Sequence, residues 1–169
     1  MDTFFEQIIS VKKSSKAIAA IIGIWLLAIL ISAVAFLFLP IPSLTFLLIV
    51  GLFFAAFKLA GMFNIEYEYI ITNGIMDVDK ITNKGSRKRV LSFELSNVSR
   101  LEKFNPSLLN SAKPKDIIKA CDSSDKNAYL MVSSQEGKGT YYLVFAPDER
   151  IKSAIVKFVP KFIANTAFN

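Results

Sequence analysis

The hydrophobic pattern divides the chain near Asn64. Residues 17–39 contain no charged residue, and residues 44–63 contain only Lys58. About 20 apolar residues are needed for a helix to cross a bilayer. The uncharged residues 40–43 between the two runs include two prolines, which suit an exposed turn because proline donates no backbone hydrogen bond. The pattern therefore predicts a two-helix transmembrane hairpin with spans at 17–39 and 44–63.

Beyond this point, apolar and polar residues alternate in short segments. Segment 65–72 is rich in β-forming residues and precedes Asn73 and Gly74, a pair typical of a two-residue hairpin turn. Alternation places Tyr69 and Ile71 on a core face and Glu66, Glu68, Asp77 and Asp79 on the opposite face. Seven strands are expected, at 65–72, 75–82, 87–95, 97–104, 116–121, 127–134 and 139–146.

After the last expected strand, the apolar period becomes helical. Pro147 and the acidic residues that follow it suit the first turn of a helix. Pro160 is expected to kink or fray the last turn. An apolar stripe at helical spacing predicts that this helix covers an open end of the β core; it consists of Ile151, Ala154, Ile155, Phe158 and Phe162. The predicted class is α+β.

The segment before the first span has its own pattern. Phe4, Phe5, Ile8 and Ile9 fall roughly on one face of a helix over residues 1–11. This spacing is typical of an amphipathic helix that lies on the inner leaflet. Three regions are therefore expected: an N-terminal cytoplasmic segment (1–16), the hairpin (17–63) and a cytoplasmic C-terminal domain (64–169).

Charge around the spans predicts their orientation. Lys12, Lys13 and Lys16 precede the first span, Lys58 closes the second, and the turn at 40–43 is uncharged. Because lysine and arginine favour the cytoplasmic side, both termini are expected in the cytoplasm of a multi-pass cell-membrane protein. A cleaved signal peptide is the alternative, since residues 33–35 resemble a cleavage site, but the apolar run continues past them.

The composition limits the class of protein and the kinds of active site that this chain could form. The 169 residues are 53% hydrophobic and include one cysteine and no histidine, so a soluble globule, a disulfide scaffold and every Ser-His or Cys-His arrangement are excluded. The carboxylates on the polar sheet face are expected to form ion pairs with a neighbouring strand; a divalent-cation site is the minor alternative. Cys121 is expected to be a small buried hydrophobe. No catalytic residue, metal or cofactor is assigned.

Four strands, three strands and a C-terminal helix are the element order of a pleckstrin-homology (PH)-like domain. The chain resembles a family of small two-span membrane proteins of Gram-positive anaerobes with such a domain at the C-terminus. The resemblance rests on residues 1–7, on 66–74 with 77–80, and on Arg87–Arg89 before Leu91-Ser-Phe93. It implies a PH-like bent β-sandwich or barrel capped by a helix. No activity is assigned to the family, so no catalytic residue is carried over.

Two sets of residues are candidate contact sites. Basic residues in the domain could face anionic lipid or a partner protein: Lys84, Arg87, Lys88, Arg89, Arg150, Lys157 and Lys161. Small residues four apart could bring helices together, within the hairpin or in a homo-oligomer: Ala19, Gly23, Ala28, Ser32, Gly51, Ala55, Ala56 and Ala60. The sequence thus favours a non-enzymatic, membrane-anchored interaction module with a protein or lipid partner and no nucleic-acid partner. A structural subunit of a membrane complex, oligomerising through its spans, is the alternative.

Overall fold

The computed structural model describes residues 3–110, 112–122, 124–135 and 139–168. The chain divides into two compact units. We call Lys12–Ile65 with Thr82–Gly85 the hairpin unit, and Met1–Val11, Glu66–Ile81 and Ser86–Asn169 the sheet unit. The two are described separately.

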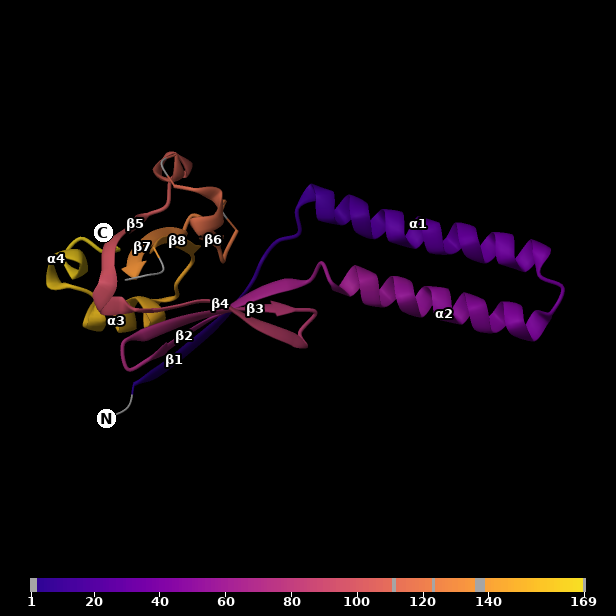
Figure 1. The fold of residues 1–169 in the computed structure, drawn as a ribbon, viewed down its shortest axis with the longest axis horizontal. Coiled ribbons are helices and arrows are strands. Elements are labelled where there is room, and N and C mark those ends of the chain that lie inside the picture. Colours follow the sequence, from indigo (N-terminus) through magenta and orange to yellow (C-terminus); the bar gives the residue numbers. More distant parts are fainter. Residues whose placement is uncertain (1–2, 111, 123, 136–138, 169) are drawn as a thin grey trace. The chain divides into compact units, whose positions relative to one another are not determined.

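Two long antiparallel helices form most of the hairpin unit (Figure 1). Helix α1 (Ser15–Phe38) is capped by Ser14, whose side chain accepts a hydrogen bond from the Ala17 N–H. Helix α2 (Pro42–Gly61) has proline in its first turn, where a missing N–H costs no helical bond. Both helices are long and apolar enough to cross a membrane. Their bounds match the two predicted spans within a few residues.

The first sheet contains a strand that the sequence analysis assigned to a helix. Strand β1 (Phe4–Ser10) pairs antiparallel with β2 (Ile65–Thr72), with Ser10 opposite Glu66. The amphipathic helix expected over residues 1–11 is therefore wrong. The side chains of β1 alternate in exposure, and Phe5 and Ile9 pack against the core, which a strand allows because its side chains alternate between faces. The expected domain boundary at residue 64 omits this strand.

The remaining strands complete two four-stranded sheets. The first sheet continues through β3 (Ile75–Thr82) and β4 (Ser86–Glu94) in the order β1-β2-β3-β4 (Figure 1). The second has the order β5-β7-β8-β6, with β6 parallel to β8. Its strands are β5 (Val98–Lys103), β6 (Ile117–Lys119), β7 (Tyr129–Gln135) and β8 (Gly139–Phe145).

The strand count differs from the prediction by one. Each of the seven predicted ranges overlaps a strand, and β1 makes eight among the described residues. The fourth predicted strand, now β5, belongs to the second sheet, because the short 3-10 helix Leu95–Asn97 turns the chain out of the first. Further 3-10 turns at Pro106–Leu109 and Pro114–Asp116 lie between β5 and β6. Asn73 and Gly74, at φ 49° and 86°, form the predicted tight turn between β2 and β3.

The C-terminal segment forms two helices rather than one. Helix α3 (Glu149–Phe158) begins after Asp148, whose carboxylate accepts a hydrogen bond from the Ile151 N–H at 2.8 Å. Pro160 separates it from the one-turn helix α4 (Lys161–Ala164). The expectation that Phe162 is buried is wrong: it is 68% exposed, and Ile163 is buried in its place, because the break at Pro160 interrupts the helical period.

The core lies between the two sheets and under α3. Its largest buried side chains come from both sheets and include Tyr69, Met76, Phe93, Leu143 and Phe145. The Tyr69 hydroxyl donates to the Ala120 carbonyl at 2.7 Å and accepts from the Ala146 N–H at 3.3 Å. This buried tyrosine therefore joins the first sheet to the second with both of its polar contacts satisfied.

Candidate functional site

An ion-pair network covers the polar face of the first sheet. Arg87 Nη1 lies 3.1 Å from Glu68 Oε2. Arg89 binds two carboxylates, with Nη1 2.8 Å from Asp77 Oδ2 and Nε 2.9 Å from Asp79 Oδ1. The predicted pairing of this acidic cluster with the next basic strand is therefore present, and it accounts for three of the four carboxylates.

The same face is less solvated than the sequence suggested. Glu68 is fully buried and Asp79 is 6% exposed. Strand β1 supplies the cover, because Ile8 lies directly opposite Glu68 on the same side of the sheet. Burial raises the pKa of Glu68 above its ordinary value, and the neighbouring Glu6 carboxyl raises it further, against the opposing effect of Arg87.

The carboxylates of this network are held by neighbouring side chains. The arginine contacts engage Glu68, Asp77 and Asp79, and the Ser10 hydroxyl donates to Glu66 at 3.1 Å. Within the described ranges, no group of three or more His, Cys, Asp or Glu side chains is arranged to hold a metal ion. Cys121 is buried, and burial raises the pKa of its thiol to about 12, which keeps it protonated and unreactive at neutral pH.

The predicted basic residues fall into two kinds. Arg87 and Arg89 are bound to carboxylates, and Arg150 forms an ion pair with Asp148 at 3.0 Å. Lys157 Nζ lies 5.6 Å from the centre of the Phe5 ring, a cation–π contact that joins α3 to β1. Three lysines are exposed and form no ion pair or cation–π contact with the residues that the structure describes: Lys84, Lys88 and Lys161.

Lys84 belongs to the hairpin unit through the turn Thr82–Gly85. The Asn83 N–H donates to the Asn64 carbonyl at 2.8 Å, immediately after the end of α2. The sequence analysis placed Lys84 among the basic residues of the C-terminal domain. The structure places its turn against the end of the second long helix instead.

The small residues of the hairpin lie on two different faces of its helices, one buried between the helices and one exposed. Ala28, Ser32 and Ala56 are buried between the helices, where Trp25 and Phe53 also meet with ring centres 5.9 Å apart. In contrast, Gly23 and Gly51 have open space where a side chain would stand, and Ala19 and Ala55 are exposed. Ala60 is half-buried. Packing within the hairpin therefore explains only some of the eight predicted positions.

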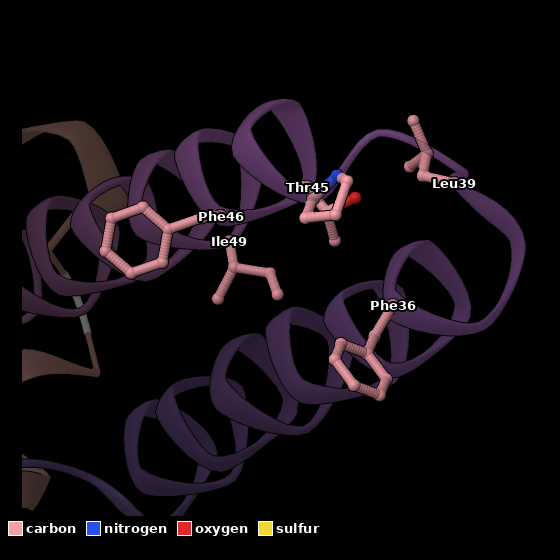
Figure 2. A pocket seen from close by; sticks show the side chains of 6 residues that line it. Phe36, Leu39, Thr45, Phe46 and Ile49 are labelled. Atoms are coloured by element: carbon pink, nitrogen blue, oxygen red, sulfur yellow. The ribbon is translucent and has the colours of Figure 1, made fainter.

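A cavity lies at the turn end of the hairpin (Figure 2). It has a volume of about 230 Å³ and is lined by Phe36, Leu39, Pro42, Thr45, Phe46 and Ile49. The Thr45 hydroxyl donates to the Ile41 carbonyl at 3.0 Å, so its polar atom is satisfied within the helix. Because the lining is apolar and uncharged, the cavity would accept a hydrocarbon group more readily than a polar substrate.

A second, more polar cavity of about 350 Å³ lies in the sheet unit. Its lining includes Gly74, Ile75, Glu94, Ser96 and Phe158. Glu94 is the ionisable residue of this lining, and it accepts a hydrogen bond from the Ser96 hydroxyl at 3.2 Å. One exposed carboxylate without a second acid or base does not form an acid–base pair.

Gln7 is the structural residue that sequence reasoning missed. Its side-chain amide donates to the Ala146 carbonyl at 3.1 Å and accepts from the Asp148 N–H at 2.8 Å. These bonds tie β1 to the start of α3. A glutamine between Phe5 and Ile9 on one face of a strand was the available signal, but it was read as part of a helix.

Two β-sheets followed by a C-terminal helix are consistent with the PH-like class, and a long helical hairpin is inserted between the first two strands. A comparison with protein families matches residues 1–165 to the family described as Bacterial PH-like domain (DUF6106). The chain belongs to this family. The match includes β1 and both long helices as well as the later strands. No curated protein and no solved structure was found to match the chain.

Proposed function

We propose that the protein is a non-enzymatic interaction module anchored in the cell membrane by two spans, with its PH-like domain and both termini in the cytoplasm. The observation that carries this proposal is the place of the hairpin in the chain. Strand β1 ends at Ser10, α1 begins at Ser15, α2 ends at Gly61 and β2 begins at Ile65. Short connections therefore attach the hairpin to two strands that pair with each other.

The character of the hairpin surface supports the membrane anchor. Many of its outward side chains are large and apolar, and Phe38 and Phe46 are 80% and 70% exposed. Exposure of so much apolar surface is unfavourable in water and favourable in hydrocarbon. The lysines near the α1 start and the α2 end favour the cytoplasmic side for that end of the hairpin.

A protein partner is the favoured ligand of the module. The spans already hold the domain at the membrane, so lipid affinity alone would add little to its localisation. The ion-paired carboxylates and the protonated Cys121 thiol support a binding role over a catalytic one.

A structural subunit that oligomerises through its spans is the second candidate. Gly51 and Ala55 favour it, because they lie on the outward surface of α2, where a second helix could approach closely.

Pull-down with a tagged full-length chain from detergent-solubilised membranes tests the two candidates. The double variant Gly51→Leu with Ala55→Leu is compared with Val50→Leu and Phe54→Leu, which change neighbouring outward positions that are already large. The module hypothesis expects both variants to retain the partner and the partner to crosslink to the sheet unit. Loss of the partner in the glycine–alanine variant alone would favour the subunit hypothesis.

A further inference from the structure

The β3–β4 turn is fixed to the end of α2. In addition to the hydrogen bond from the Asn83 N–H to the Asn64 carbonyl, the Asn83 side chain packs directly over Gly61. A Cβ atom at Gly61 would lie 2.7 Å from Asn83 Oδ1, so a larger residue there would require the Asn83 side chain to move. Gly61 is buried by this contact. The turn is thus part of the same compact unit as the two long helices.

All charges of the hairpin unit are positive. Residues 12–65 and 82–85 contain Lys12, Lys13, Lys16, Lys58 and Lys84 and no Asp or Glu. All five lysines are exposed. They belong to the start of α1, the last turn of α2 and the turn that packs after α2, which lie at one end of the antiparallel hairpin (Figure 1).

The start of α1 carries positive charge that no acidic residue of its first turn balances. Lys16 lies in its first turn, Lys12 and Lys13 precede its cap, and the first turn contains no acidic residue. The N-terminal end of a helix carries partial positive charge, so acidic groups are favourable there and lysines are not. An anion from outside the unit would remove this repulsion.

Lys84 occupies a backbone conformation that favours glycine. Asn83 and Lys84 have φ angles of 52° and 57°, and the Gly85 N–H donates to the Thr82 carbonyl, as in a tight hairpin turn. The turn between β2 and β3 has Asn73 at the first of these positions and Gly74 at the second. Lysine therefore stands where glycine would fit with less strain, which points to a use for its charge.

We propose that these five lysines form a binding surface for the headgroups of anionic phospholipids, with Lys84 and the β3–β4 turn held at the membrane surface. The proposal rests on the membrane anchor in the proposed function. Lys12, Lys13, Lys16 and Lys58 are also explained by their role in span orientation. Lys84 is distant from both spans in sequence, so orientation does not account for it, and it is the residue that tests the proposal.

The test uses the full-length chain in phosphatidylcholine membranes with spin-labelled phosphatidylglycerol or spin-labelled phosphatidylcholine as probe. Electron paramagnetic resonance gives the relative association of the two lipids with the protein. The key variant is Lys84→Gly, which removes the charge and relieves the backbone. Lys84→Arg keeps the charge, and Lys126→Gly removes an exposed lysine from a turn of the sheet unit.

We expect the wild type to select phosphatidylglycerol, and Lys84→Gly to reduce this selectivity about fivefold at low salt. Lys84→Arg and Lys126→Gly should keep it. Lys84→Gly should also melt at a higher temperature than the wild type, which separates loss of binding from loss of structure. Unchanged selectivity in Lys84→Gly would overturn the proposal, and so would equal loss in Lys126→Gly.

Failure of the anchor is distinguishable from failure of the lipid site. Extraction of the wild-type chain from membranes by alkaline carbonate would contradict the proposed function itself. A wild-type chain that resists extraction and does not select phosphatidylglycerol would retain the anchor and overturn the lipid site alone.

Discussion

The long helices and the C-terminal helix bury opposite kinds of side chain. Helix α1 buries Ala28, Ser32 and Ala35 and exposes residues such as Phe38. Helix α3 buries Ile151 and Ile155 and exposes the charged residues Glu149, Arg150 and Lys157. In α3, apolar side chains leave water for a core. In a hairpin surrounded by hydrocarbon that gain is absent, so close approach of small residues decides the packing. This difference is the one that the proposed membrane anchor would produce, with hydrocarbon around the hairpin and water around the sheet unit.

The largest expected effect comes from separating β1 from the rest of the sheet unit. The fragment 64–169 lacks this strand, the Phe5 and Ile9 contacts and both Gln7 hydrogen bonds. It should show no cooperative thermal unfolding by circular dichroism. Residues 1–11 joined to 65–169 through Asn-Gly should unfold cooperatively, because Ser10 and Glu66 are already paired and a two-residue turn closes such strands. Cooperative unfolding of 64–169 with the same midpoint would contradict the role of β1.

Two phenylalanines distinguish the core from the surface of the sheet unit. Phe145 is fully buried and packs edge-to-face on Tyr69, whereas Phe162 is 68% exposed. Phe145→Ala should lower the free energy of unfolding by about 3–5 kcal/mol. Phe162→Ala, the matched control, should change it by less than about 0.5 kcal/mol. Thermal unfolding of the full chain in detergent measures both, and a large loss for Phe162→Ala would mean that α4 is packed differently.

Adjacent alanines of α2 test the packing within the hairpin. Ala56 is 3% exposed between the helices, and Ala55 is exposed. Ala56→Leu should destabilise the hairpin by about 1–3 kcal/mol, because the added atoms overfill a closed contact. Ala55→Leu should leave the monomer unchanged. Quenching of Trp25 fluorescence, which reports on its contact with Phe53, measures the separation of the helices. Equal effects of the two variants would contradict the described interface.

The buried carboxyl on the polar sheet face predicts a smaller, pH-dependent effect. The folded-state pKa of Glu68 is raised, so the folded chain holds this proton more tightly than the unfolded chain does. Its contribution to stability is therefore present below the unfolded pKa and is lost as pH rises through the folded pKa. Melting temperatures between about pH 4 and about pH 7 should fall less steeply for Glu68→Gln than for the wild type. A steeper fall for the variant would contradict the raised pKa.

Local patterns predicted the elements whose contacts are close in sequence. The two apolar runs, the Asn73-Gly74 turn and the buried face with Tyr69 and Ile71 are all present. The stripe on α3 was correct as far as Phe158, where the break at Pro160 ended its period.

The missed features depend on contacts that are distant in sequence. The apolar residues of segment 4–10 fit a helix as well as a strand, and its partner β2 lies beyond both long helices. Alternation placed Glu68 on the polar face correctly, but its burial depends on β1, which was not recognised. The assignment of Lys84 to the hairpin unit depends on the contact between Asn83 and Gly61, which has no local signature.

Cysteine accessibility in intact cells tests the central claim, a cytoplasmic PH-like domain held by two spans. In a Cys121→Ser background, single cysteines replace Ser43 in the hairpin turn and Lys126 in an exposed turn of the sheet unit. A membrane-impermeant maleimide should label the cysteine at 43 in intact cells and the cysteine at 126 only after the cells are opened. Labelling of position 126 but not of position 43 in intact cells would contradict the proposed orientation and place the domain outside.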